Sequence, residues 1–317
     1  MNFGGPRTLK EVLPFLESLL TDEEVIRTSL PSWIQRLFFR YIARKRALKS
    51  AKEYALIGGG SPIYADTEWV ATALSKRMGI PILAFHRYLE DTHDTFCEML
   101  QQYDPEKILV FPLFPQFSYT TTGSIAKWFQ EHLGFKWTQK MQWVKSYSAH
   151  TLYIKVMVAC AQEFLQEQGL QESDTVLFCS AHGLPKQFIL EGDPYQKECE
   201  ASFKAIACCF PQAHAILAYQ SKFGRQEWLT PATGTLCRQP QLFMEGKKQV
   251  VFIPVSFSSD HVETLFEIEG YVSCLQKLGV PAYRCPALGR REDWMDAAAE
   301  MLKENAFVSN DALIRVK

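Results

Sequence analysis

The sequence lacks any apolar stretch that approaches the roughly 20 residues a transmembrane helix requires. It also lacks an excess of either charge: 34 Lys and Arg stand against 35 Asp and Glu, for a formal net charge of −1. No overall field therefore favours nucleic acid or another strongly charged partner. Met1 leads directly into a glycine motif, without the charged and apolar leader of a signal peptide. These absences predict a soluble protein.

Nine cysteines occur without a Cys-x-x-Cys pair or a regular disulfide spacing, and zinc-type His/Cys spacings are absent. In a chain without a secretory signal, this usage indicates reduced thiols and a cytoplasmic location. The glycines at 58–60 lack the third glycine of a dinucleotide-binding fingerprint and the Gly-Lys-Ser/Thr of a phosphate-binding loop. We interpret them as a tight turn that leaves Ser61 available to a ligand.

Short apolar runs alternate with helical patterns along the chain. The strands are predicted at residues 54–57, 80–85, 107–111, 142–146, 175–179, 213–219, 249–253 and 282–285. The helices are predicted at residues 8–30, 33–52, 66–78, 92–102, 152–168, 195–208, 263–277 and 292–303. This alternation predicts an α/β fold with parallel sheets and helices on both faces.

A chain of 317 residues suggests two domains, at about 150 residues each. We place the boundary near 145–150, which gives domains of 1–147 and 148–317. The last helix is free to pack back on the first domain.

The most informative stretch begins where the buried run 249–253 stops at Pro254. A polar loop with His261 follows, and then Glu263 and Glu267 stand four residues apart, on one face of a predicted helix. Polar side chains after a strand are where α/β proteins build their sites. The alternative is a solvated acidic helix start, since carboxylates are favoured at the positive end of the helix dipole.

His182 follows another buried run, 175–179, and precedes Gly183 and Pro185, which shape the backbone for close approach to a ligand. A lone histidine is more often a packed or surface residue. An imidazole that faces a carboxylate, however, can accept protons near neutral pH or hold a divalent metal such as ferrous iron.

Residues 33–52 predict a basic amphipathic helix. Its apolar residues are Trp33, Ile34, Leu37, Phe38, Tyr41 and Ile42, and its basic residues are Arg36, Arg40, Arg44, Lys45, Arg46, Lys49 and Lys52. Such a helix can lie on an anionic membrane surface or bind an acidic ligand. An ordinary core helix with a basic solvent face fits the pattern equally well. Nucleic acid is disfavoured, because the rest of the chain offers no companion patch.

A set of short motifs, in this order along the chain, resembles the ferrochelatases, which insert ferrous iron into a porphyrin to make haem. The motifs are Asn2-Phe3-Gly4-Gly5-Pro6, Gly58-Gly59-Gly60-Ser61-Pro62, Pro115-Gln116-Phe117-Ser118, Thr121-Thr122-Gly123-Ser124, Ser180-Ala181-His182-Gly183-Leu184-Pro185, Gly192-Asp193-Pro194-Tyr195, Gln220-Ser221-Lys222 and Ser259-Asp260-His261-Val262-Glu263-Thr264-Leu265. The resemblance runs nearly end to end. It implies two Rossmann-like domains, each a parallel sheet flanked by helices, as in chelatases.

The resemblance also implies roles for particular residues. His182 and Glu263 would be the catalytic pair that binds iron or takes the pyrrole protons, with the division of these roles open. Glu267 would continue an acidic ridge that delivers the metal or carries protons away. The family usually has a further carboxylate on this ridge, and this sequence has Tyr271 near that position. The porphyrin-binding residues would be Phe3, Arg46, Lys49, Tyr54, Ser61, Arg87, Tyr88, Trp228, Phe257 and His261, of which Phe3, Trp228 and Phe257 are equally compatible with core positions.

We therefore predict a ferrochelatase that inserts Fe²⁺ into protoporphyrin IX to form protohaem. Phe3 favours this porphyrin, because the coproporphyrin branch of the family has a tyrosine there. The alternatives are a chelatase for coproporphyrin, a chelatase for cobalt or nickel in another tetrapyrrole, and a non-catalytic haem or porphyrin carrier. The protein would be cytoplasmic, either free or peripheral at the inner face of the membrane through residues 33–52.

No tightly bound cofactor is expected, and iron is a substrate. Some ferrochelatases hold an iron–sulfur cluster partly through cysteines near the carboxyl terminus. The last cysteine here is Cys285, so we expect no such cluster.

The start of the chain carries one further expectation. The motif at 2–6 follows only Met1, whereas the other glycine and histidine motifs follow an apolar strand run. Ferrochelatases have a strand immediately before this motif. We therefore expect a slot with unpaired backbone groups in the first sheet, and a native product that begins several residues upstream with a Val/Leu/Ile-rich strand.

Overall fold

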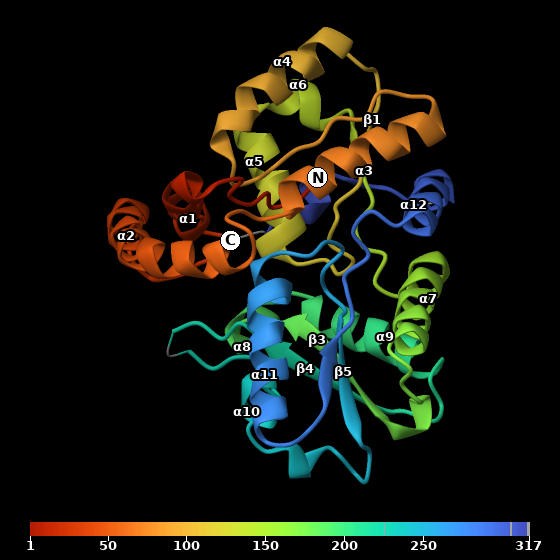
Figure 1. The fold of residues 1–317 in the computed structure, drawn as a ribbon. Coiled ribbons are helices and arrows are strands. Elements are labelled where there is room, and N and C mark those ends of the chain that lie inside the picture. The colour runs from red at the N-terminus through yellow and green to blue at the C-terminus, as the bar shows by residue number, and fades with distance from the viewer. Residues whose placement is uncertain (225, 305, 316–317) are drawn as a thin grey trace. The chain divides into compact units, whose positions relative to one another are not determined.

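The computed structural model describes residues 1–224, 226–304 and 306–315. It forms two compact units (Figure 1). The first contains Met1–Ser146 and Ala298–Lys317, and the second contains Tyr147–Ala297. The division falls inside the range 145–150 that the sequence suggested.

The first unit has a three-stranded sheet in the order β1-β2-β7. β1 (Ile108–Val110) and β2 (Met141–Trp143) are parallel, as predicted, but β7 (Val308–Ser309) pairs antiparallel with β2. A fully parallel sheet was therefore the wrong prediction for this unit. β7 follows α12 (Glu292–Glu304), and the whole second unit lies between β2 and β7 in the chain, so the connection allows either strand direction.

Helices surround this sheet. They are η1 (Leu9–Glu11), α1 (Val12–Leu20), α2 (Ser32–Leu56), α3 (Ile63–Met78), η2 (Glu90–Thr92), α4 (His93–Tyr103), the π-helix η3 (Tyr119–Gly123), α5 (Ser124–His132), α6 (Phe135–Thr138) and η7 (Asp311–Leu313). The predicted helix 8–30 ends at Leu20, and the predicted strand 54–57 is the end of α2. Tyr54 lies on the buried face of α2 with Phe39, Ala43 and Ser50, so the helical period continues through it.

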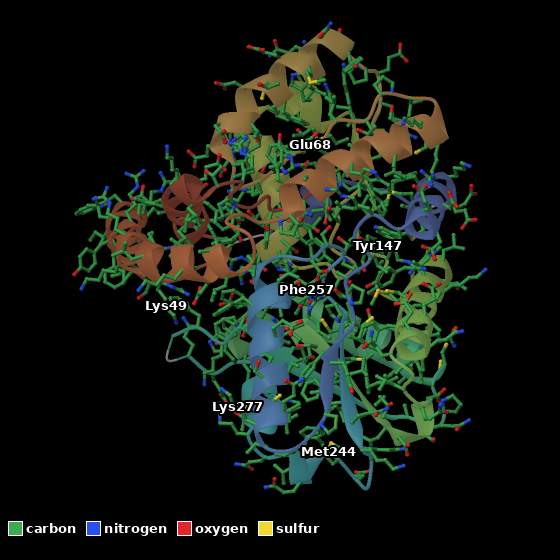
Figure 2. All side chains as sticks on the ribbon, in the orientation of Figure 1. Lys49, Glu68, Tyr147, Met244, Phe257 and Lys277 are labelled. Atoms are coloured by element: carbon green, nitrogen blue, oxygen red, sulfur yellow. The ribbon has the colours of Figure 1, made fainter. Side chains whose placement is uncertain are left out.

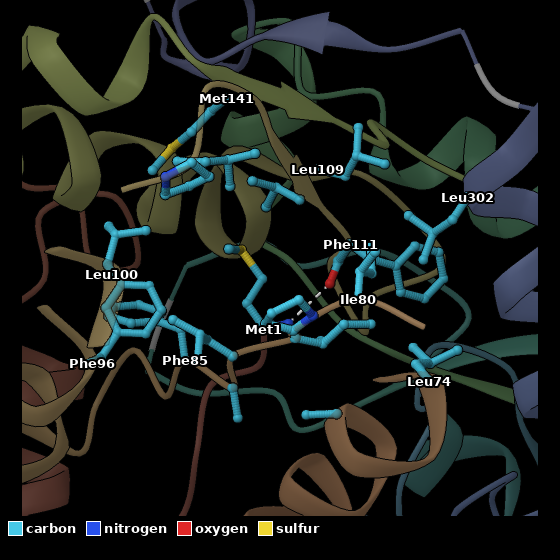
Figure 3. Close-up of a pocket in the computed structure, with 18 of the residues that line it drawn as sticks. Met1, Leu74, Ile80, Phe85, Phe96, Leu100, Leu109, Phe111, Met141 and Leu302 are labelled. Atoms are coloured by element: carbon cyan, nitrogen blue, oxygen red, sulfur yellow. Dashed lines mark hydrogen bonds between the residues drawn. The ribbon is translucent and has the colours of Figure 1, made fainter. Parts of the chain in front are cut away.

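The predicted strand 80–85 is wrong, since this segment forms no strand. Between it and β1 lies an apolar cavity of about 540 Å³ (Figure 3). The Met1 amino group is buried there and donates a hydrogen bond to the Phe111 carbonyl at 2.9 Å. Burial lowers the pKa of this amino group from 8.0 to about 5. For residues 82–84 no hydrogen bond is found in the described part of the chain, so the segment has no strand partner to define it.

The second unit has a four-stranded, fully parallel sheet in the order β4-β3-β5-β6. Its strands are β3 (Thr175–His182), β4 (His214–Gln220), β5 (Gln249–Pro254) and β6 (Ala282–Arg284). All four predicted strands are confirmed here, with ends that move by up to three residues.

Helices cover both faces of this sheet. They are α7 (Thr151–Glu167), η4 (Glu172–Asp174), α8 (Lys186–Leu190), α9 (Tyr195–Ala207), α10 (Thr233–Leu236), η5 (Pro240–Leu242), the π-helix η6 (Glu263–Ile268) and α11 (Glu269–Lys277). In Figure 1, α11 lies on one side of the strands and α7 and α9 lie on the other. The core on the α11 side joins Val176, Phe178 and Phe252 of the strands to Ile268 and Leu275 of the helices. Within the described residues, none of the helices combines the length and apolar character needed to cross a membrane.

Candidate functional site

His182 is the last residue of β3, which is buried from Thr175 to Ala181 and half-buried at His182 itself. β3 pairs with β4 up to His182 and with β5 up to Ser180, so neighbours on both sides fix its carboxyl end. The His182 backbone N–H donates to Ser256 Oγ at 2.9 Å, and its carbonyl accepts from the Tyr195 hydroxyl at 3.0 Å. The main chain of His182 is therefore held from both sides, which restricts where its imidazole can point.

Glu263 reaches the same edge of the sheet from the segment after β5. The helix predicted from residue 263 opens with the π-helix η6 and becomes α-helical only at Glu269. π-helical turns are uncommon and occur mostly at functional sites. Glu263 Oε2 lies 2.8 Å from His182 Nδ1, so the structure brings the two predicted catalytic residues together.

Each member of this pair favours the charged form of the other. Desolvation lowers the pKa of His182, but the charge and hydrogen bond of Glu263 and the charge of Glu267 outweigh it, so the pKa lies above the ordinary 6.5. Desolvation likewise raises the pKa of Glu263, but the charge and hydrogen bond of His182 hold it well below the ordinary 4.5. With Nδ1 directed at Glu263, a neutral His182 keeps the Nε2 lone pair for a metal or a proton.

Three of the predicted porphyrin residues lie in the same unit as His182. The ring centroid of Phe257 lies 6.5 Å from that of His182 and 4.7 Å from that of His261. Figure 2 shows Phe257 beyond β5, near the start of α11. His261 Nε2 lies 3.6 Å from Glu263 Oε2, and His261 Nδ1 lies 3.1 Å from the Ser259 carbonyl.

Trp228 belongs to a segment that bridges to Pro185, directly after the His182 turn. A Cβ on Gly183 would come within 2.7 Å of the Gln220 carbonyl oxygen and 3.2 Å of the Trp228 ring, so only glycine allows this close packing. The indole Nε1 is buried and has no hydrogen-bond partner among the described residues.

Glu267, predicted as a metal residue, points toward β4 and α11. It accepts hydrogen bonds from the Ser221 backbone and from the Tyr271 hydroxyl. Among the described residues, no group of three or more His, Cys, Asp or Glu is placed to hold a metal ion.

A second cluster of predicted residues lies in the first unit. Arg87 and Tyr88 both bond Asp22 Oδ2, at 2.7 Å from Arg87 Nη2 and 3.0 Å from the Tyr88 hydroxyl. Ser124 Oγ donates to the same oxygen at 2.5 Å. The Phe3 ring packs on Tyr88 with centroids 5.2 Å apart. Asp22 was not predicted from the sequence, because a single acid between two helices carries no spacing signal.

The remaining predicted residues lie on α2 and the turn that follows it. Arg46 and Lys49 are exposed, and Lys49 Nζ lies 3.7 Å from Glu53 on the next turn. Tyr54 is buried, and so is Ser61, whose backbone N–H donates to the Pro6 carbonyl at 2.7 Å. Ser61 therefore joins the glycine turn to the motif at the start of the chain.

Comparison with known proteins identifies the family of this chain. The family model named Ferrochelatase matches residues 1–306. The chain is 40% identical over 315 residues to the ferrochelatase of Chlamydia abortus, which covers 99% of this chain and 97% of the relative. The ferrochelatase of Chlamydia caviae is 41% identical over the same shares, and that of Chlamydia pneumoniae is 38% identical, covering 94% of that relative.

Solved structures support the fold. CbiX, the terminal enzyme of sirohaem biosynthesis in denitrifying bacteria, superposes with a TM-score of 0.53 at 15% identity, covering 76% of this chain and 90% of CbiX. SirB from Bacillus subtilis superposes with a TM-score of 0.51 at 13% identity, covering 75% of this chain and 88% of SirB. The predicted chelatase-like α/β fold is thus confirmed, and on the strength of its nearly full-length matches this chain belongs to the ferrochelatase family.

Proposed function

We propose that this protein inserts ferrous iron into protoporphyrin IX, which yields protohaem and two protons as in haem biosynthesis. The observation that carries the proposal is the His182–Glu263 pair, held at 2.8 Å at the carboxyl edge of a parallel sheet. Family membership makes iron and a porphyrin the substrates. Relatives named ferrochelatase match nearly the whole chain, which favours this activity over another metal or a carrier role.

The chemistry asks for a group that receives the iron and a group that takes the two pyrrole protons. Glu263 and the Nε2 of a neutral His182 can each serve either purpose. When His182 accepts a proton, the negative charge of Glu263 stabilises the positive charge that the imidazole gains. Phe257 and Trp228 supply apolar surface beside the pair, where a porphyrin ring packs favourably.

The porphyrin propionates need cationic and hydroxyl partners. We assign this role to Arg46, Lys49, Tyr54 and Ser61, with Phe3, Arg87 and Tyr88 around the ring and His261 beside the catalytic pair. Arg46 and Lys49 are exposed basic side chains on α2, and guanidinium groups bind carboxylates with two parallel hydrogen bonds. The Asp22 anchor holds Arg87 and Tyr88 in fixed orientations.

The proposal requires no resident cofactor. The tail from Pro286 to Lys317 contains no cysteine, so the carboxy-terminal ligands of an iron–sulfur cluster are missing from the sequence. Purified protein assayed for iron and acid-labile sulfide should contain neither in stoichiometric amount.

An anaerobic assay with ferrous iron and protoporphyrin IX tests the function. The porphyrin spectrum should convert to that of protohaem with many turnovers per chain. A single stoichiometric spectral change would indicate a carrier instead. Faster insertion of cobalt or nickel, or a preference for coproporphyrin, would indicate one of the other chelatases.

We also propose that the protein works in the cytoplasm and contacts the inner face of the membrane through α2. Trp33, Leu37 and Tyr41 lie one turn apart on the outer face of α2 and are 66%, 61% and 53% exposed. Exposed basic residues, Arg40 and Lys45 among them, share the helix. Apolar side chains next to cations suit an anionic membrane surface.

Vesicle flotation tests this contact. The protein should float with vesicles of phosphatidylglycerol and phosphatidylcholine, and less with phosphatidylcholine alone. The double variant Trp33→Ser, Leu37→Ser should lose flotation, whereas Leu242→Ser, an exposed leucine far along the chain on η5, should not. Equal flotation of both variants would contradict the assignment.

A further inference from the structure

The Glu267 carboxylate receives four hydrogen bonds. Its Oε1 accepts from the Tyr271 hydroxyl at 2.6 Å and from the Ser221 backbone N–H at 2.8 Å. Its Oε2 accepts from Ser221 Oγ at 2.5 Å and from Gln220 Nε2 at 3.3 Å. A carboxylate offers about four lone-pair positions, so these donors fill them.

Glu263, one turn earlier, is different. Its Oε2 faces His182 Nδ1 at 2.8 Å, and its Oε1 has no hydrogen bond among the described residues. A metal ligand needs a free lone pair, which Glu263 retains and Glu267 does not. The two carboxylates of the ridge are therefore not equivalent.

The donors to Glu267 belong to the turn that ends β4. Ser221 has a φ of +63°, a left-handed conformation that non-glycine residues adopt at a cost. Two bonds from this one residue to Glu267, through its backbone N–H and its hydroxyl, offset that cost. Glu267 thus holds a strained turn in place.

Gln220 transmits this restraint to the catalytic pair. Its side-chain oxygen accepts from Ser180 Oγ at 2.6 Å, two residues before His182 on β3. Its Nε2 donates to the Glu263 carbonyl at 3.1 Å, and its own carbonyl accepts from the Gly183 N–H at 2.8 Å. One side chain thus ties the end of β3 to the first residue of η6.

We propose that Glu267 is a positioning residue and not a metal ligand. Tyr271 fixes Glu267 in this role, and the iron contacts His182 and Glu263 but not Glu267. Glu267, Ser221 and Gln220 form a brace between β3, β4 and η6 that sets the distance between His182 and Glu263. The Tyr271 hydroxyl occupies the last lone-pair position of the Glu267 carboxylate, so this carboxylate keeps no position for a metal. The proposal rests on the function proposed above and replaces the metal role predicted for Glu267.

Three near-isosteric variants of the full chain test it: Glu267→Gln, Tyr271→Phe and Glu263→Gln. Two readouts are needed, namely kcat and KM for Fe²⁺ in anaerobic turnover, and the Kd of Zn²⁺ by calorimetry without porphyrin. Glu269→Gln is the matched control, because that carboxylate lies two residues away and pairs with Arg284 instead.

In Glu267→Gln, kcat should fall about tenfold to a hundredfold, the range for lost hydrogen bonds to a charged group, while the Fe²⁺ KM and Zn²⁺ Kd stay within about twofold. Tyr271→Phe should lower kcat in the same way but less, by about threefold to tenfold. Glu263→Gln should weaken Zn²⁺ binding by more than about tenfold. The control should match the native protein in every readout.

Two results would overturn the proposal. One is a loss of Zn²⁺ affinity in Glu267→Gln as large as in Glu263→Gln, which would make Glu267 a ligand. The other is native kcat in both Glu267→Gln and Tyr271→Phe. If Glu267→Gln does not fold, Tyr271→Phe carries the test alone. Absence of turnover in the native protein would instead count against the proposed function, and the Zn²⁺ titrations would still decide whether Glu267 is a ligand.

Discussion

His182 Nδ1 lies 2.8 Å from Glu263 Oε2, although 81 residues separate the two in the chain. The sheet accounts for this proximity. β3 and β5 are adjacent and parallel, with Ser180 opposite Pro254, so the segments that follow both strands emerge at one edge. Parallel strands ordinarily build their sites at this edge.

Replacing His182 or Glu263 with alanine should lower the rate of iron insertion by at least about a hundredfold, because a group that moves protons or binds the metal acts mainly in the transition state. Porphyrin affinity should stay within about tenfold. Porphyrin fluorescence quenching measures the affinity, and haem absorbance measures the rate. Glu269→Ala, an exposed carboxylate on α11, is the control. Native turnover in either alanine variant would remove the pair from the mechanism.

The pair also predicts a pH dependence. The pKa of His182 is raised in the folded protein, so the stabilisation that it gains from Glu263 is fully present below its unfolded pKa of 6.5. It is lost as the pH rises through the higher folded pKa. The difference in free energy of unfolding between the native protein and Glu263→Gln should therefore shrink as the pH rises above 6.5. A difference that grows over this range would mean that His182 is buried neutral.

The centre of the site could be predicted from the sequence because it follows buried strands. The apolar runs 175–179 and 249–253 clearly predict buried strands. His182 lies in the segment that follows the first run, and His261 and Glu263 lie in the segment that follows the second. Asp22 could not be predicted, since its partners Arg87 and Tyr88 are 65 and 66 residues away and no periodic pattern links them. Two of the four donors to Glu267 belong to Ser221 and depend on a turn conformation that composition does not indicate.

The second sheet was predicted well, and the first was not. In the second unit the central strands β3 and β5 are buried, largely apolar runs with a partner on each side, and β4 and β6 pair along the outer edges, so local pattern and pairing agree. In the first unit, residues 80–85 have the same apolar pattern, but among the described residues 82–84 have no hydrogen-bonded partner, and an extended segment without a partner is not a strand. The short β7 pairs across a long sequence separation, for which two residues give no signal.

Arg46→Ala should weaken porphyrin binding by about tenfold to a hundredfold, the range for a lost charge-assisted contact, and change kcat less. Lys52→Ala, an exposed cation on the same helix, should have little effect. The Kd values for protoporphyrin and its dimethyl ester provide the measurement. If Arg46→Ala weakens binding of the ester as much as that of the diacid, Arg46 does not bind a propionate.

Protoporphyrin should be the better substrate than coproporphyrin. Phe3 packs between Tyr88 and Phe114 and offers no hydroxyl to a metal or to an added propionate. In Phe3→Tyr the ratio of kcat/KM values for the two porphyrins should shift toward coproporphyrin, while Phe3→Leu should leave the preference unchanged. Equal kcat/KM values in the native protein would count against this role of Phe3.

The cavity beside Met1 predicts that an added strand stabilises the first unit. Met1 and Asn2 are hydrogen-bonded to Phe111 and Phe85 on its two sides, so residues placed before Met1 would run between those segments. A five-residue Val/Leu/Ile extension would bury two or three apolar side chains, and each would stabilise the fold by about 1.5–3 kcal/mol. The lost conformational entropy costs about 1–2 kcal/mol for each ordered residue. Backbone hydrogen bonds on both edges of the new strand add to the gain.

We therefore expect this extension to raise the free energy of unfolding by about 1–3 kcal/mol, as measured by guanidinium denaturation. A Gly/Ser extension of equal length is the control, because it can form backbone bonds but leaves the apolar walls of the cavity without partners. The extension also replaces the buried Met1 amino group, whose pKa is lowered to about 5, with an uncharged peptide nitrogen. The gain should therefore be larger at pH 5 than at pH 8, since the unfolded chain alone keeps that amino group protonated below its ordinary pKa of 8.0. Equal stability of the two extensions would show that the cavity does not accept a strand.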